Sequence, residues 1–183
     1  MKKLIMISAA IIMMASFSTR SSAQSSVTIN PTAGVELVQV LTITNSTPLN
    51  FGRIGITSGV AGTVIMGTDG TRTPGLGTTV IISTGTSRAV AKFDLTGTTG
   101  VVYTISIPSP IVVTTLSGTG TKTMNINALK VNVDAAGEVA AAGATGTFAL
   151  GVSSFLMSGT LNIVTDQAKG IYAGTYPVTV DYQ

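Results

Sequence analysis

Short runs of alternating apolar and polar residues, separated by glycines, are the feature that most limits how this chain can fold. In one clear run, apolar positions alternate with polar or charged ones: Ala89, Ala91, Phe93 and Leu95 against Arg88, Lys92 and Asp94. A period of two residues is that of a half-buried strand. The alanine-rich stretch 135–144 is the one helix candidate, but Gly137 and Gly143 interrupt it, so we predict a hairpin loop with a turn over 134–137. The chain is therefore predicted to be all-β, a sandwich or a barrel.

The alternating runs predict about ten short strands, a number that suits a sandwich. They cover residues 35–44, 49–54, 78–83, 88–96, 101–107, 124–128, 129–133, 148–152, 161–163 and 175–182. Turns are predicted at Asp69-Gly70 and Pro74-Gly75, within a glycine-rich hairpin region. Pro108 and Pro110 should end or edge the strand before them.

The N-terminus predicts export. Lys2 and Lys3 precede an apolar run, Leu4 to Phe17, and small residues follow at Ser21-Ser22-Ala23. This is the pattern of a secretory signal peptide over residues 1–23, too short and too early for a spanning helix. No later stretch is apolar enough to cross a bilayer. We expect an arm at residues 24–34 and a single β-domain at 35–183, released into the periplasm, the cell surface or the medium.

The charge balance gives no sign of a nucleic-acid or membrane partner. The full chain has ten Lys and Arg against seven Asp and Glu. Three of the cations, Lys2, Lys3 and Arg20, lie in the predicted signal peptide, which leaves seven of each sign. Few charges and much threonine suit packing against copies of the same chain. The chain has no cysteine, so disulfides and a lipid-modified cysteine are excluded.

Residue types needed for most catalysis are missing. With neither histidine nor cysteine, Ser-His and Cys-His nucleophile pairs are impossible and the commonest zinc ligands are absent. The acidic residues occur singly along the chain, without the clustered aspartates of a calcium loop. We predict no enzymatic activity, no catalytic residue, no metal site and no cofactor.

The C-terminal segment Gly170 to Gln183 combines two features. Tyr176, Val178, Val180 and Tyr182 point one way and Thr175, Thr179 and Asp181 the other, and Gly170 stands fourteenth from the end. Gly170 with Tyr182 on such a strand resembles the C-terminal signature of subunits assembled by the chaperone-usher pathway. That resemblance implies an immunoglobulin-like β-sandwich lacking its last strand, with this segment lining the open groove and facing a chaperone. The alternative is an ordinary secreted all-β domain that ends in an aromatic-rich strand.

A second resemblance spans essentially the whole mature chain. The segment Leu49-Asn50-Phe51-Gly52-Arg53-Ile54, together with Gly170 to Gln183, is similar to a secreted bacterial domain-of-unknown-function family, number 4402. Its members look like relatives of the archaic chaperone-usher pilins, and no activity comes with the family name. The chain lacks the cysteine pair of many pilins.

The predicted arm offers a strand that another subunit would accept. Apolar residues fall on alternate positions: Val27, Ile29, Pro31, Ala33, Val35 and Leu37. A donated strand binds through backbone hydrogen bonds, and its alternate side chains fix the register. Pro31 has no N–H to donate, which counts against full pairing. The alternative is a mobile leader before the first strand.

From these features we expect a structural subunit of a bacterial surface pilus, polymerised by donor-strand exchange. Its partners would be identical or homologous subunits, a periplasmic chaperone and an outer-membrane usher. The sandwich would be either complete by itself or completed by a donated strand. The alternative is a secreted monomeric adhesin or carbohydrate-binding module. Carbohydrate sites usually need aromatic platforms, and the chain has no tryptophan and four tyrosines.

Overall fold

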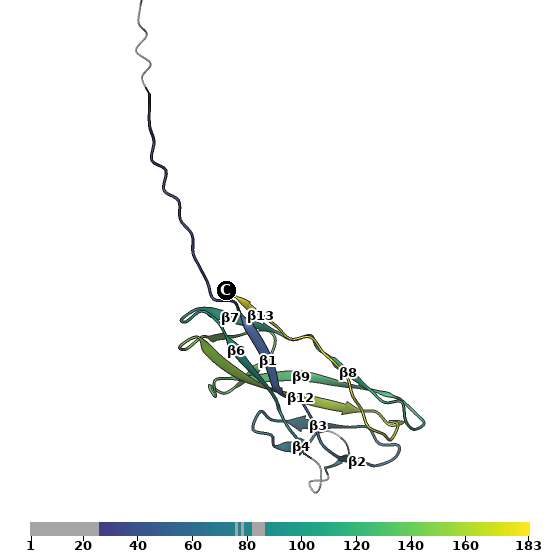
Figure 1. Ribbon diagram of the computed structural model, residues 1–183. Helices are drawn as coiled ribbons and strands as arrows, with labels where there is room; N and C mark the ends of the chain where they lie inside the picture. Colours follow the sequence, from purple (N-terminus) through teal and green to yellow (C-terminus); the bar gives the residue numbers. More distant parts are fainter. Residues whose placement is uncertain (1–25, 76, 78, 82–86) are drawn as a thin grey trace, which may run out of the picture. The chain divides into compact units, whose positions relative to one another are not determined.

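The computed structural model describes residues 26–75, 77, 79–81 and 87–183 (Figure 1). The chain divides into two units, residues 1–36 and 37–183. In the first unit, residues 26–36 form no strand and their side chains are exposed. The predicted signal peptide, residues 1–23, lies outside the described residues.

The second unit is built from strands, as the alternating pattern predicts. They are β1 (Thr42–Thr47), β2 (Ile54–Ile56), β3 (Gly62–Met66), β4 (Arg72–Pro74), β5 (Thr79–Ile81), β6 (Ala91–Thr96), β7 (Val102–Ser106), β8 (Ile111–Thr114), β9 (Thr123–Val133), β10 (Glu138–Ala140), β11 (Ala144–Thr147), β12 (Val152–Ile163) and β13 (Thr179–Tyr182). The described part of the chain contains no helix, so none there is long and apolar enough to cross a membrane. The predicted all-β sandwich is confirmed.

Strand β12 is the centre of an eight-stranded antiparallel sheet. One edge of β12 pairs with β9, and the other pairs first with β6 and then with β3. The sheet continues from β6 to β1, from β3 to β4, and from β9 to both β8 and β10. Phe155 of β12 faces Phe93 of β6 at a ring-centroid distance of 4.8 Å. Residues 155–157 and 160–162 of β12 are paired on both edges, which satisfies the backbone polar groups of those residues within the sheet.

A three-stranded sheet, ordered β11-β7-β13, packs against the large sheet, and β2 pairs separately with β5. The core contains the inward residues of both larger sheets, including Phe155 and Met157 from one and Tyr103 and Ile105 from the other. The hydroxyl of Tyr103 forms a buried hydrogen bond with the Ser153 hydroxyl across the two sheets. Burial raises the pKa of Tyr103.

The two alternating runs at 124–128 and 129–133 belong to one strand, β9, and not to two. Opposite the β12 stretch Ser158–Thr160 the register shifts, and Ala128 has a φ of 45°. An inserted residue of this kind is a β-bulge, which reverses the face that each following side chain takes. This explains why Ile126 and Leu129 are both buried although three positions separate them.

Three predicted strands differ from the structure. Of the predicted strand 49–54, only Asn50, in a bridge with Ala89, and Ile54, the first residue of β2, take part in pairing between strands. The predicted strand 35–44 begins only at Thr42, because residues 35–41 have no ladder partner among the described residues. The predicted strand 148–152 is instead a turn: Val152 N–H donates to Ala149 O at 3.0 Å, and Leu150 lies at its tip with a φ of 51°. Phe148 is buried while Leu150 and Val152 are exposed, so they do not share a face.

Other predictions are partly right. The turn over 134–137 is present, but the predicted loop 135–144 also contains β10. The Asp69-Gly70 turn joins β3 to β4, whereas Gly75 N–H continues the β3–β4 ladder by donating to Thr63 O. Strands β3 and β8 were not predicted, and residues 78, 82 and 83 of the predicted strand 78–83 lie outside the described residues.

Candidate functional site

Several strands of the sandwich pair on one side only, and two of them, β1 and β13, lie near the two ends of the second unit's sequence. Among the described residues, β1 pairs only with β6, and the C-terminal β13 pairs only with β7. An edge strand presents unpaired N–H and C=O groups that can accept a strand from another chain. Both strands lie at the end of the domain where the C-terminus emerges (Figure 1).

Tyr182 ties the two edges together at that end. Its hydroxyl donates to Gln39 O and accepts from Thr98 N–H, each at 2.8 Å. Gln39 N–H in turn donates to the Thr98 hydroxyl at 2.7 Å. The ring of Tyr182 lies edge-on to Phe148 at 5.9 Å. A side chain at Gly97 would have its Cβ 2.7 Å from the Tyr182 hydroxyl, so this contact requires glycine.

Half-buried apolar side chains accompany the two edges. They contact the core but remain partly open to solvent: Leu41 and Leu49 on either side of β1, and Tyr176, Val178 and Tyr182 in and before β13. Ile43 within β1 is 39% exposed. Burial raises the pKa of Tyr176, so its hydroxyl stays neutral over the physiological range. Apolar surface therefore remains available beside backbone that has no strand partner.

The C-terminal segment reaches β13 by crossing from one sheet to the other. Ala173 and Thr114 exchange backbone hydrogen bonds at 2.8 and 2.9 Å, which places the segment beside β8. Residues 179–182 then pair with β7. A Cβ at Gly170 would lie 2.5 Å from the Thr115 hydroxyl, so this position also needs glycine.

A polar cluster fixes the start of this segment. Tyr172 hydroxyl donates to Ala168 O at 2.7 Å and accepts from the Gln167 side-chain amide at 2.6 Å. The same amide donates to Thr121 O at 2.7 Å. Tyr172 is therefore a structural anchor.

The sequence-predicted site residues fall into two sets. The C-terminal set keeps the predicted alternation: Val180 is buried and Tyr176, Val178 and Tyr182 are half-buried, while Thr179 and Asp181 are exposed. Regular pairing covers only 179–182 of the predicted 175–182. The arm residues Val27, Ile29, Ala33, Val35 and Leu37 are exposed and lie in no strand.

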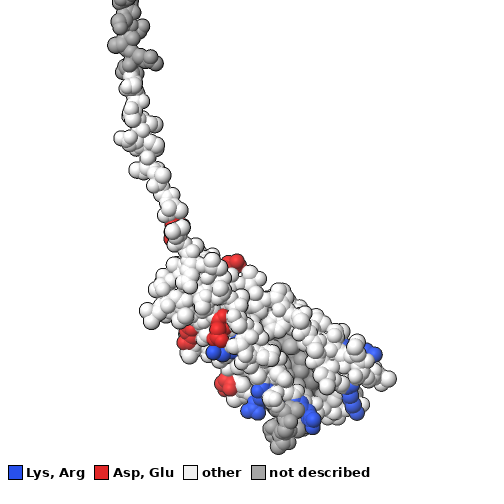
Figure 2. Space-filling model, in the orientation of Figure 1, with Lys and Arg blue, Asp and Glu red and all other residues white. Residues whose placement is uncertain are grey.

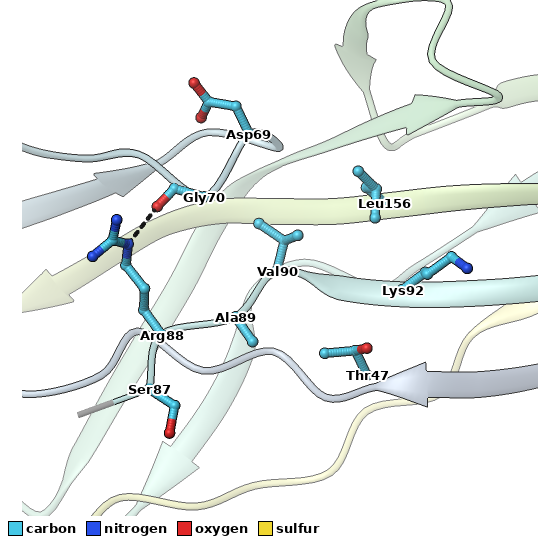
Figure 3. A pocket seen from close by; sticks show the side chains of 9 residues that line it. All are labelled: Thr47, Asp69, Gly70, Ser87, Arg88, Ala89, Val90, Lys92 and Leu156. Atoms are coloured by element: carbon cyan, nitrogen blue, oxygen red, sulfur yellow. Dashed lines mark hydrogen bonds between the residues drawn. The ribbon is translucent and has the colours of Figure 1, made fainter. Parts of the chain in front are cut away.

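A surface pocket lies elsewhere, on the face formed by β6 and β12 (Figure 3). Val90 and Leu156 supply its apolar lining, and Asp69, Arg88 and Lys92 supply charge. Arg88 Nε donates to Gly70 O at 2.9 Å, and Lys92 pairs with Asp94 at 2.9 Å. The Thr71 hydroxyl holds the pKa of Asp69 below its usual range. Each of these three charged side chains is thus engaged by a group of its own chain.

No group of three or more potential metal ligands occurs in the part of the chain that the structure describes. The carboxylate of Glu138, on β10, binds groups of its own chain. It accepts hydrogen bonds from the backbone N–H and the hydroxyl of Thr68, and it lies 3.1 Å from Lys130 Nζ. The Thr68 N–H is the main reason that the pKa of Glu138 is lowered. This contact is structural.

The fold defines a β-sandwich domain, and its candidate site is formed by the free edges of β1 and β13. The chain belongs to the family described as "Domain of unknown function (DUF4402)", which it matches over residues 41–182. Comparison with curated proteins and with solved structures gave no match. The predicted membership of this family is confirmed.

Sequence reasoning missed Gln39 and Thr98, which bind Tyr182. Neither lies at a position with a recognisable motif, because a threonine or glutamine acquires this role only through the packing of distant segments. The sequence pattern could have identified Leu41 and Ile43 as site residues, since they continue the alternation of the predicted strand 35–44.

Proposed function

We propose that this protein is a structural subunit of a bacterial surface filament, polymerised when the arm of one copy pairs with the free edges of another. The observation that carries the proposal is that one chain has both an arm and strand edges that pair with nothing among the described residues. The arm alternates apolar residues from Val27 to Leu37, and these side chains are exposed. β1 and β13 each have one free edge in the described structure.

The chemistry of the two parts is complementary. The donated strand would supply backbone groups to the edges and alternate apolar side chains to Leu41, Ile43 and Val178. Fully burying a valine or isoleucine contributes about 1.5–3 kcal/mol relative to exposure. Several such side chains in register would make the contact long-lived. Before polymerisation a periplasmic chaperone would cover the same edges, and an outer-membrane usher would direct their exchange.

The monomeric adhesin or carbohydrate-binding alternative has less support. An aromatic platform needs an exposed ring face, but Tyr103 is buried and the other three tyrosines are half-buried. The hydroxyls of Tyr172 and Tyr182 are also engaged in hydrogen bonds within the domain. We therefore assign the protein a structural role, without catalysis, and a location at the cell surface after export.

The test uses the exported full-length chain on a denaturing gel, unboiled and boiled. Donor-strand polymers should appear as a ladder that collapses to monomer only on boiling. The matched variants are Ile29→Asp and Thr28→Asp, which place the same charge on opposite faces of the arm. Ile29→Asp should reduce the polymer on the order of tenfold or more, since each 1.4 kcal/mol lost is a factor of ten, and Thr28→Asp should leave it nearly unchanged.

A single monomer band in both lanes for the unmodified chain would contradict the proposal and favour a self-contained domain. Equal effects of the two variants would show that the arm acts through its charge or length, without a strand register.

A further inference from the structure

Among the residues of the second unit whose exposure is described, the three most exposed leucine and isoleucine side chains lie at its two ends. They are Leu116 at 97%, Leu150 at 90% and Ile171 at 90% exposure. Leu150 lies at the end of the domain where β12 begins. Leu116 and Ile171 lie at the end where β12 finishes. With about 3.3 Å per residue, the twelve residues of β12 separate the two ends by roughly 36 Å.

Leu150 occupies a position that its own conformation disfavours. It is the first residue of a two-residue hairpin turn, with a φ of 51°, and Gly151 follows with a φ of 80°. Turns of this type favour asparagine, aspartate or glycine at both positions, and a left-handed conformation costs other residues about 1–2 kcal/mol. Neither burial within the domain nor local geometry favours a leucine here, whereas a contact outside the domain would.

Leu150 belongs to a larger apolar surface. Val152 is exposed, and it aligns with Thr96 and Thr42 across neighbouring strands. Val40, two residues before Thr42, is exposed as well. The side chain of Gln39 approaches Gly151, which brings the start of the second unit to this turn. We call this the Leu150 end.

The opposite end has its own apolar pair. Thr114 and Ala173 form an antiparallel bridge, and continuing that register places Ile171 opposite Leu116. Gly170 packs against Thr115 and Ser117, the neighbours of Leu116, which agrees with this placement. We call this the Leu116 end.

The charges of the two ends are also complementary. At the Leu116 end two exposed lysines outnumber one exposed carboxylate. Lys122 lies across from Thr115 and Lys169 is two residues before Ile171, while Asp166 accepts a hydrogen bond from the Thr121 hydroxyl. The Leu150 end carries Asp181, in the strand whose Tyr182 packs on Phe148, and Asp134, bonded to Ser153 and Ser154. On the face drawn in Figure 2, lysine and arginine gather towards one end and leave the other without blue side chains.

We propose that the Leu150 end of one copy docks on the Leu116 end of the next copy. This inference rests on the proposed function, because the arm is covalently attached at the Leu150 end, beside Gln39. A contact between two different patches of the same chain repeats in one direction, and it gives an open filament when the rotation between copies does not close a ring. The end contact would fix the angle between successive subunits, which a donated arm alone leaves free.

The test exploits the absence of cysteine from the chain. The double variant Leu150→Cys/Leu116→Cys is exported, allowed to polymerise and oxidised. Disulfides between successive copies should give a ladder that survives boiling and collapses only with reductant. The control is Leu150→Cys/Val139→Cys, in which the second thiol is on the exposed edge strand β10. Because contact holds the thiols at millimolar effective concentration, we expect the pair at the ends to cross-link on the order of tenfold more than the control.

The outcomes separate this inference from the proposed function. A boil-sensitive ladder without cross-links, although both thiols react with maleimide, would leave the arm exchange standing and overturn the end contact. If no boil-sensitive ladder forms, the arm proposal fails, and oxidation of the concentrated monomer decides the end contact: cross-links between the thiols introduced at positions 150 and 116 support it, and their absence overturns it. Dimers of the single Leu150→Cys variant, as abundant as the ladder of the pair, would show a symmetric contact and also overturn it.

Discussion

The C-terminal strand and the N-terminal arm have the same sequence pattern and different structures. Residues 176–182 and residues 27–37 both alternate apolar with polar side chains. Residues 179–182 of the first segment pair with β7, whereas the second segment lies in no strand. The difference is that β13 has a partner edge and the Tyr182 anchor within its own chain. An alternating segment is thus able to form a strand, but it does so only where the edge of another strand is available to pair with it.

The largest effect should come from removing that anchor. Tyr182→Ala deletes a ring that packs on Phe148 and a hydroxyl with two hydrogen bonds. We expect the free energy of unfolding of the freshly refolded monomer to fall by about 3 kcal/mol, measured in urea. The control is Leu37→Ala, in an exposed apolar residue, which should change the free energy of unfolding by less than about 0.5 kcal/mol. Equal losses would mean that residues around Leu37 pack in solution as firmly as β13.

This contrast also explains how far the sequence could predict the structure. The period of two residues predicted the all-β class, the core face of β6 and the alternation of the C-terminal strand, since these depend on local burial. It failed for residues 35–41, where the pattern is present but the partner is not. It also failed at 148–152. There Leu150 lies in a turn, but it is apolar and two residues after Phe148, so the sequence alternates as a strand would.

The candidate site shows the same division. The alternation placed Tyr176, Val178 and Val180 on one face correctly. The roles of Gln39 and Thr98 depend on contacts across 143 and 84 residues of sequence, and no local pattern encodes such contacts.

A smaller effect should separate the Tyr182 hydroxyl from its ring. Tyr182→Phe keeps the packing and leaves Gln39 O and Thr98 N–H without this partner. We expect a loss of about 1–2 kcal/mol, measured by urea unfolding. Tyr176→Phe is the control, because no hydrogen bond of the Tyr176 hydroxyl occurs within the described structure, and its change should be below about 0.5 kcal/mol. A Tyr182→Phe protein as stable as the parent would show that the ring alone anchors β13.

A third prediction concerns the backbone N–H of Thr68, which is buried. Unlike the backbone N–H groups on the free edges, it has a side-chain acceptor, the carboxylate of Glu138. Glu138 accepts from Thr68 N–H, and this bond lowers the pKa of the carboxyl. The folded state therefore binds fewer protons than the unfolded state near pH 4. The contribution is complete above the ordinary glutamate pKa of about 4.3 and disappears as the pH falls through the lowered value.

Glu138→Gln should accordingly lose less stability than the parent between about pH 5 and pH 3. At pH 7 the two proteins should differ by less than about 1 kcal/mol, because the amide oxygen still accepts from Thr68. Thermal unfolding across this pH range provides the measurement. Asp69 and Asp94 also have lowered pKa values, so the variant should keep part of the slope. Superimposable profiles would show that Glu138 contributes nothing to acid sensitivity.

The smallest expected effect is a gain. Leu150→Asn places a favoured residue before Gly151 in a turn where both residues have positive φ, so it should stabilise the monomer by about 0.5–1 kcal/mol in urea unfolding. Leu116→Asn, at a side chain just as exposed but without a positive φ, should leave stability unchanged. If the same Leu150→Asn protein polymerises less well, then the leucine is retained at a cost in stability for the sake of a contact between copies. If the monomer gains nothing, the conformation is not costly for leucine, and the physical reason for placing a partner on this turn is lost.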